Sequence, residues 1–254
     1  MELVWETREG VPLLHARGAG ARIAFTSRGG GVSDGTFASL NLGFATPDDP
    51  ASVAENRRRA LVAAGADPAR TFALRQRHGT TVVEAGALPP GSYLDASFAW
   101  PEADALVTSR PGSALVAHGA DCLTVALVAA GGARVSAVHA GWRGLVAGVL
   151  EAAAGAVGPG FAAAVGPGAG ACCYEVGEEV AAPIRARFGE DAVAAGHADL
   201  ALCARRALES AGAAEVAVAN LCTICDAEHF HSHRRDGALS GRQAVIVTIG
   251  EGYA

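Results

Sequence analysis

The chain has no lysine: all 20 of its basic residues are arginines. Without lysine there can be no Schiff-base chemistry, no covalent attachment of pyridoxal phosphate and no P-loop lysine. Any phosphate that binds must therefore be held by arginine side chains, or by backbone N–H groups at the start of a helix.

Methionine and long apolar runs are also scarce. The single methionine is Met1, which leaves none for the axial position of a blue-copper site. The uncharged stretch 152–174 is interrupted by many glycines and by two prolines, so it is a poor membrane helix. Residues 1–6 lack the basic and apolar regions of a signal peptide. Six cysteines in 254 residues do not suggest a disulfide framework. We expect a cytoplasmic protein without a membrane partner.

The net charge of −6 argues against general binding to nucleic acid or to anionic membranes. It leaves room for a small anion at a local basic site. Half of the residues are hydrophobic, which is enough for a substantial core. Strand-like and helical segments are mixed along the chain without a clear linker. We therefore predict an α+β fold, a single layered α/β domain with a mixed β-sheet that spans residues 1–254.

The pattern of apolar residues gives the expected elements. Strands are expected at 22–26, 80–83, 105–108, 114–117, 124–130, 133–139, 215–220 and 243–249, and helices at 50–64, 144–157, 177–188 and 198–211. The first helix is well marked, because Asp49 can cap it, Pro50 suits its first position and Gly65 follows its end. The aromatic, proline- and glycine-rich segment 86–101 is the longest loop expected, and it could form part of a cleft rim.

The strongest chemical signal comes from His139-Ala-Gly-Trp-Arg-Gly144 and the preceding Ala120-Asp121-Cys122. His139 and Cys122 lie at the far ends of two strand-like runs that are separated by a Gly-Gly pair. If the two glycines form a hairpin turn, His139 lies opposite Thr124 and Cys122 points to the same face. Such diagonal neighbours are about 7–8 Å apart at the backbone, within reach of a shared ion. The residues alone predict either a metal site or a nucleophile–base dyad.

The same residues carry a family resemblance over nearly the whole chain. The sequence resembles the bacterial YfiH-type laccase-domain proteins, also described as multicopper polyphenol oxidoreductase-like or FAMIN-like purine nucleoside enzymes. Besides the two motifs above, the matching segments are Ser27–Ser33, Ser39–Gly43, Glu55–Arg57, Gln76–Gly79, Ala103–Ala105, Gly166–Pro167, Tyr174–Gly177 and Ser232–Gly237.

The resemblance implies a zinc site formed by His78, Cys122 and His139. Three nitrogen and sulfur ligands leave a fourth tetrahedral position open, which is typical of catalytic rather than structural zinc. The resemblance further implies purine nucleosides and phosphate as partners, with phosphorolysis of adenosine, inosine, guanosine and methylthioadenosine and deamination of adenosine. We expect a monomer or a homodimer.

Within this frame, two residues are candidates for catalysis. Arg143 and the amides that begin the following helix offer an anion site for phosphorolysis. Asp121 is the nearest acid that could carry a proton during deamination, although a hydrogen bond in the core would suit it equally well. Substrate-binding candidates are Arg28, Asn41, Arg57 and Gln76.

Four alternatives remain open, one of which is a metal-binding or redox protein without turnover. A metal-free cysteine hydrolase would use Cys122 as nucleophile and His139 as base. A copper-dependent polyphenol oxidase fits less well, because the chain has 8 histidines and His-x-His spacing occurs only in the run His229-x-His231-x-His233. Cys222-x2-Cys225, followed by His229, His231 and His233, resembles one half of a structural zinc pattern. In the family resemblance, His231 and His233 stand at non-ligand positions.

Overall fold

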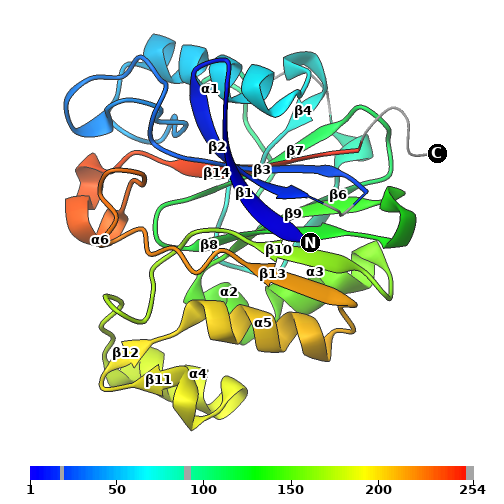
Figure 1. The fold of residues 1–254 in the computed structure, drawn as a ribbon, viewed down its shortest axis with the longest axis vertical. Coiled ribbons are helices and arrows are strands. Elements are labelled where there is room, and N and C mark those ends of the chain that lie inside the picture. Colours follow the sequence, from blue (N-terminus) through cyan, green and yellow to red (C-terminus); the bar gives the residue numbers. More distant parts are fainter. Residues whose placement is uncertain (18–19, 89–92, 250–254) are drawn as a thin grey trace.

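Two six-stranded β-sheets pack face to face at the centre of the molecule (Figure 1). The computed structural model describes residues 1–17, 20–88 and 93–249. The first sheet has the order β1 (Glu2–Arg8), β2 (Val11–Arg17), β3 (Arg22–Thr26), β14 (Gln243–Thr248), β7 (Ala114–Gly119) and β4 (Thr71–Phe72). The second has the order β13 (Glu215–Val218), β10 (Ala162–Val165), β8 (Leu123–Val128), β9 (Val135–Ala140), β6 (Ala105–Thr108) and β5 (Val82–Glu84).

Both sheets are mixed, and their central strands are buried on both faces. β4 pairs with β7 in parallel within an otherwise antiparallel sheet, and the second sheet has parallel pairs at both edges. Every residue of β8, β9 and β14 is buried, which explains why these strands read as nearly continuous apolar runs. Leu115 and Val245 of the first sheet share one core with Val128 and Ala137 of the second.

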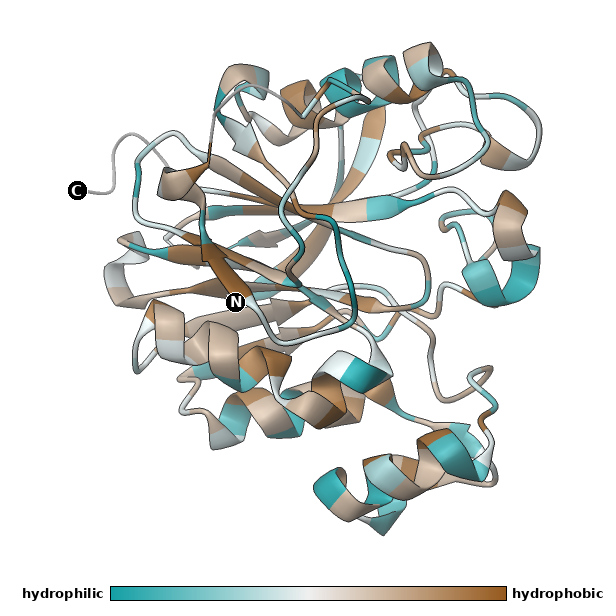
Figure 2. Cartoon of the chain, turned by 180° about the vertical axis from the view of Figure 1, so that it is seen from behind, coloured by the Kyte–Doolittle hydropathy of each residue, from teal (hydrophilic) through white to brown (hydrophobic). Residues whose placement is uncertain are grey.

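Helices cover the outer faces of this sandwich. α1 (Pro50–Ala64) packs on β2 and β3, while α2 (Trp142–Ala147), α3 (Val149–Val157) and α5 (Leu200–Ser210) pack on the second sheet. α4 (Glu178–Phe188) and the hairpin of β11 (Val193–Ala194) and β12 (His197–Ala198) form a lobe beyond α5 (Figure 1). The short α6 (His233–Asp236) precedes β14. Hydrophobic residues are concentrated on the central strands (Figure 2). In the described parts of the chain, every helix is too short or too polar to cross a bilayer.

The predicted α+β fold is confirmed, with the strands divided between two mixed sheets. The first helix occupies the predicted residues: the Asp49 carboxylate accepts the N–H groups of Ala51 and Ser52, and Gly65 ends the helix in the left-handed conformation. The helix expected at 144–157 is instead two helices, because Gly148 has φ 98° and interrupts it. The other predicted helices and all predicted strands are present with shifted ends. β1, β2 and β10 were not predicted, and β10 consists mostly of alanine, which has little strand propensity.

The predicted hairpin has the predicted register. His139 lies opposite Thr124, and Cys122 directly precedes β8. The turn is a short 3-10 segment, Ala130–Gly132, in which Gly131 and Gly132 have φ of 76° and 75°. The opposite end of this hairpin is where the candidate site forms.

Candidate functional site

Three potential metal ligands converge at one end of the central strands: His78, Cys122 and His139. His78 lies on the segment 73–81, where the chain crosses from the first sheet to the second. Cys122 lies on the second such crossing, residues 120–122, and His139 lies in β9. His78 and Asp121 have φ of 63° and 82°, values that non-glycine residues rarely adopt and that are often found at functional sites.

Asp104, directly before β6, organises the ligands. Its carboxylate accepts Nδ1–H of His139 at 2.8 Å and the backbone N–H groups of His78 at 2.9 Å and Gly79 at 2.7 Å. Its own carbonyl accepts the backbone N–H of His139 at 2.8 Å. With Nδ1–H held by the carboxylate, Nε2 of His139 is the ring nitrogen left to bind a metal once its proton is lost, the arrangement usual for histidines that bind metal. One buried side chain therefore positions two ligands.

The donor atoms fit a metal ion. All three lie within 4.8 Å of one another, and Cys122 Sγ is 3.8 Å from His78 Nε2. A tetrahedral zinc with Zn–S of about 2.3 Å and Zn–N of about 2.0 Å places sulfur and nitrogen about 3.6 Å apart. Gly141 leaves the space for this group, because a Cβ there would lie 2.8 Å from Cys122 Sγ and 3.0 Å from His78 Cδ2.

The charges of the site favour ionised cysteine. Burial raises the pKa of Cys122, but hydrogen bonds from His139 and His78 outweigh burial and bring this pKa to about 6. Burial lowers the pKa of His139, whereas Asp104 and Cys122 raise it, to about 9. At neutral pH, Cys122 is thus a thiolate beside the His139 imidazolium. A thiolate is the form that binds metal or acts as a nucleophile, and metal binding would displace the imidazolium proton.

The three ligands open onto a cavity of about 850 Å³, a size typical of small-molecule sites. Three aromatic side chains line it: Phe44, Phe98 and Trp100. Phe98 and Trp100 pack edge to face, with ring centroids 4.6 Å apart. They belong to the segment 86–101, so the described part of that segment does form a cleft rim, as predicted. Residues 89–92 lie outside the described residues.

Four arginines line the cavity: Arg75 and Arg77 pair with Glu102, whereas Arg57 and Arg242 do not. The Arg57 guanidinium is buried between the rings of Phe44 and Tyr93, 4.0 and 4.3 Å from their centroids, and donates to the carbonyls of Leu42 and Tyr93. Arg242 donates to the carbonyls of Ser240 and Gly241. Burial lowers the pKa of both arginines. Arg57 is buried and Arg242 is partly exposed, and within the described residues neither forms an ion pair with a carboxylate, so their charges favour an anion in the cavity.

The other predicted substrate-binding residues lie in different surroundings. Gln76 lines the cavity, and its amide exchanges two hydrogen bonds with the backbone of His118. Arg28 donates to the carbonyls of Ala38, Thr36 and Ala227, outside the cavity lining. Asn41 is fully buried and accepts the backbone N–H groups of Gly43 and Arg242, so it holds the segment that carries Arg242. Their roles in substrate binding stay predictions.

The two predicted catalytic residues flank the site. Arg143 is exposed on α2, with its guanidinium 4.5 Å from the centroid of the Trp142 ring, and it does not line the cavity. The Asp121 carboxylate accepts the Thr223 hydroxyl at 2.7 Å and the backbone N–H of Arg234 at 2.6 Å. These bonds hold two distant loops next to Cys122, which is the hydrogen-bonding role weighed for Asp121 from the sequence. Its role in proton transfer stays a prediction.

Several residues of the site were not singled out from the sequence. Asp104 lies in the Ala103–Ala105 motif. This motif directly precedes an expected strand, and that position could have indicated that Asp104 belongs to the site. Arg242 precedes the last strand between a glycine and a glutamine. His118 lines the cavity and bonds to the Tyr93 hydroxyl at 3.0 Å, and burial holds its pKa well below the ordinary value.

The interpretation that pairs Cys222 and Cys225 with nearby histidines was wrong about the partners. The sulfurs of Cys222 and Cys225 gather instead with Cys172 and Cys173. His229 pairs with Asp226, and His231 is buried with neither ring nitrogen hydrogen-bonded. His233 interacts with the carbonyl of Gly237.

Comparison with known proteins agrees with the resemblance seen in the sequence. A purine nucleoside phosphorylase of Deinococcus radiodurans is 39% identical over 96% of this chain and 95% of its own length. A purine nucleoside phosphorylase of Escherichia coli, YfiH, is 35% identical over 91% of this chain and 94% of its own length. These relatives support an enzyme of this kind.

Solved structures share the fold over almost the whole chain. YlmD from Geobacillus stearothermophilus superposes with a TM-score of 0.87 at 30% identity, covering 98% of this chain and 99% of that one. The hypothetical protein YfiH of Bacillus licheniformis superposes with a TM-score of 0.88 at 26% identity, covering 96% and 98%. The family model described as multi-copper polyphenol oxidoreductase laccase matches residues 22–250. The chain therefore belongs to this laccase-like family, which includes the YfiH proteins.

Proposed function

We propose that this protein is a zinc-dependent purine nucleoside phosphorylase that also deaminates adenosine. The observation that carries the proposal is the cavity in which the His78–Cys122–His139 group, an aromatic rim and two arginines without carboxylate partners, Arg57 and Arg242, meet. The names of the relatives support the phosphorylase class. We take residues 1–254 to be one catalytic domain.

Arg57 and Arg242 suit phosphate. Both are fixed by carbonyl groups, so their positions are set before an anion arrives. A phosphate beside them would offset the cost of taking the buried Arg57 and the half-buried Arg242 out of water without a carboxylate partner. In phosphorolysis a phosphate oxygen bonds to C1′ of the ribose, the C1′–N9 bond breaks, and the base leaves with a proton. The products are the free base and ribose 1-phosphate. Arg28 and Arg143 remain further candidates for this anion.

The aromatic rim suits a purine. Phe98 and Trp100 present ring surfaces on which a flat base can stack, and base–aromatic stacking contributes about 1–3 kcal/mol per base in nucleic-acid complexes. Gln76 and His118 add polar groups to the same cavity. Together they would orient the base, and Arg57 and Arg242 would attract the phosphate.

His78, Cys122 and His139 would hold zinc. The metal would supply a Lewis acid able to polarise an oxygen of substrate or water. Asp104 fixes the tautomer of His139 and keeps Cys122 ionised through it. Deamination of adenosine replaces the 6-amino group with oxygen from water and releases ammonia, which requires proton transfers. Asp121 is the acid proposed for them, and it would have to exchange one of its two present hydrogen-bond partners to act.

The test is product analysis on the purified, zinc-loaded protein. Inosine should give hypoxanthine and ribose 1-phosphate only when phosphate is present, and adenosine should give inosine and ammonia even without phosphate. Arg242→Gln should raise the KM for phosphate at least tenfold, and Arg57→Lys should raise it less because the charge remains. Arg205→Gln, at an exposed arginine of α5, is the control and should match the wild type. Turnover of inosine without phosphate would contradict the phosphorylase proposal.

One observation favours a second candidate, a metal-free cysteine hydrolase. Cys122, His139 and Asp104 are arranged as nucleophile, base and orienting acid, and Cys122 is ionised at neutral pH. His78 separates the two candidates. A hydrolase should tolerate His78→Ala and survive chelation, whereas the zinc enzyme should lose at least 100-fold in kcat/KM in both cases.

A further inference from the structure

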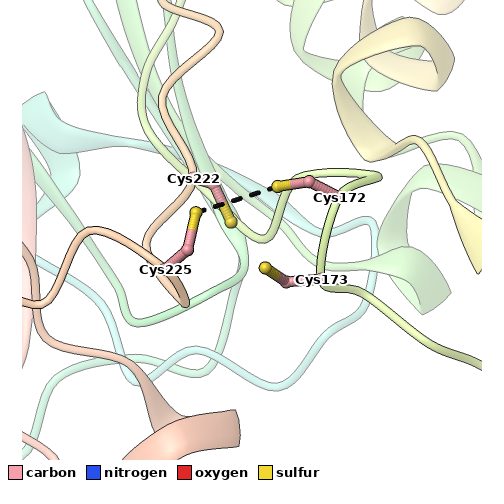
Figure 3. A group of neighbouring side chains, drawn as sticks. All are labelled: Cys172, Cys173, Cys222 and Cys225. Carbon is pink, nitrogen blue, oxygen red and sulfur yellow. Dashed lines mark hydrogen bonds between the residues drawn. The ribbon is translucent and has the colours of Figure 1, made fainter.

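A second group of potential metal ligands lies outside the cavity. The sulfurs of Cys172, Cys173, Cys222 and Cys225 all lie within 4.8 Å of one another (Figure 3). They come from two loops: one follows β10 and leads to α4, and the other follows β13 and leads to α6. None of these cysteines lines the large cavity. The cluster is therefore separate from the His78–Cys122–His139 site.

The spacing of the sulfurs matches a tetrahedral metal rather than a disulfide. Cys172 Sγ and Cys225 Sγ are 3.8 Å apart. A tetrahedral zinc with four Zn–S bonds of about 2.3 Å places any two sulfurs about 3.8 Å apart. A disulfide would require about 2.05 Å. Four cysteine sulfurs within 4.8 Å of one another, two of them in a Cys-x2-Cys pair, supply the closed ligand set of structural zinc sites.

The two loops are held in place for this arrangement by the backbone. The backbone N–H of Gly170 donates to Cys222 Sγ at 3.3 Å, an interaction that favours a thiolate. The N–H of Thr223 donates to the carbonyl of Gly168 at 2.9 Å, so the loops lie side by side. A Cβ at Gly170 would lie 3.0 Å from Cys222 Cβ and 3.3 Å from Cys172 Sγ, so glycine there leaves room for the sulfurs.

Two neighbouring arginines fix the same loops from the other side. Arg235 donates to the carbonyls of Thr223 and Ile224, at 2.9 and 3.0 Å, within the Cys-x2-Cys turn. Arg234 donates to the carbonyl of Glu175 at 2.8 Å, just after the Cys172–Cys173 pair. The cluster is thus supported by side chains that do not themselves bind metal, as metal sites in proteins usually are.

We propose that Cys172, Cys173, Cys222 and Cys225 bind a structural zinc ion that joins these two loops. All four ligand positions are taken by sulfur, so the ion has no open position for substrate. Thr223, between the two cysteines of the turn, donates to Asp121, the neighbour of Cys122. The ion would therefore keep the Thr223 loop in place against the candidate active site without taking part in the reaction.

Metal content of the full-length protein tests this proposal. Wild type purified without chelator should hold two zinc ions per chain. Cys225→Ser should hold one, Cys122→Ser should hold one, and the double variant should hold none. Cys203→Ala is the matched control: Cys203 is buried in α5, away from both groups, and its loss should leave two ions. Equal zinc content in Cys225→Ser and wild type would overturn the proposal.

Two further measurements exclude failure by misfolding or oxidation. Cobalt loaded into the Cys122→Ser variant should give strong thiolate-to-metal absorption. Adding Cys225→Ser to this variant should abolish the absorption, while an unchanged near-ultraviolet circular dichroism spectrum shows that the double variant is folded. Alkylation of the wild type, denatured with chelator and without reductant, should label all four cysteines. A disulfide between any two of the four in freshly purified protein would show a redox pair instead and would overturn the zinc proposal. Failure here would leave the phosphorylase test unaffected, because the two sites are assayed separately.

Discussion

Replacing Gly141 with alanine should remove metal from the His78–Cys122–His139 site while leaving the fold intact. Gly141 has φ −75° and ψ 168°, which alanine adopts without strain. The new methyl group would lie 2.8 Å from Cys122 Sγ and 3.0 Å from His78 Cδ2. Ordinary contacts between such atoms are about 3.5–4.0 Å, so each ligand must retreat by roughly 0.5–1 Å.

That displacement is large for a metal site. Metal–ligand distances are held to within about 0.2 Å of their ideal values. We therefore expect the affinity for zinc at this site to fall at least tenfold and about 100-fold if both ligands move, in the range seen when supporting contacts are removed. The overpacking itself should cost about 1–3 kcal/mol of unfolding free energy.

The measurement should report on this site alone. The rate at which iodoacetamide modifies Cys122 is followed by mass spectrometry of its peptide, at a series of buffered zinc concentrations. Bound zinc protects the thiolate, so Gly141→Ala should need at least tenfold more zinc for half-protection. Gly155→Ala is the control, because a Cβ at that position in α3 meets no atom within 4 Å. Protection of Gly141→Ala at the wild-type zinc concentration would refute the steric reasoning.

Three further predictions concern other parts of the structure. Asp104→Asn keeps one acceptor oxygen but turns an amide N–H toward a backbone or ring N–H. The affinity for zinc should therefore fall about 10–100-fold, and the free energy of unfolding should fall by about 3 kcal/mol. Unchanged values in zinc titration and urea unfolding would contradict the positioning role of Asp104. Trp100→Ala should raise the KM for inosine about tenfold, as loss of about 1–3 kcal/mol of stacking requires, with kcat nearly unchanged in initial-rate assays. Burial, with Arg28, Arg242 and Arg235 nearby and Asp236 in opposition, lowers the pKa of His231 to about 3. As pH falls, His231 is protonated in the unfolded state before it is protonated in the folded state. The free energy of unfolding therefore decreases as pH falls below about 6.5, by about 2 kcal/mol at pH 5. His231→Phe should lack that contribution when urea unfolding is compared at pH 7 and pH 5, and an equal loss in both proteins would argue against it.

The parts of the fold that the sequence predicts well are those decided by neighbouring residues. The register that places His139 opposite Thr124 follows from two adjacent glycines between apolar runs. The ends of α1 follow from the Asp49 cap and Gly65. In both cases the determining contacts lie within a few residues along the chain, so local patterns are sufficient.

The parts that could not be predicted depend on pairings between distant segments. Cys172 meets Cys225 because β10 and β13 pair in parallel, and no local pattern gives that pairing. Arg57 is a substrate-binding candidate from the sequence, but its burial between Tyr93 and Phe44, which come from two other segments, could not be predicted. His78 was identified only through the family resemblance, since its approach to Cys122 depends on the two sheets packing together.

The segments in which the chain crosses between the sheets affect how long the protein stays folded. His78 and Cys122 lie on two such crossings, and the Asp121 neighbour of Cys122 is bound by Thr223 on a third. Separating the sheets would pull apart the ligands of the proposed zinc ion, so opening of the sandwich and release of that ion would become a single event. The lifetime of the folded protein should then lengthen with the supply of zinc, a kinetic form of stability set by the rate of opening rather than by the equilibrium between folded and unfolded chains.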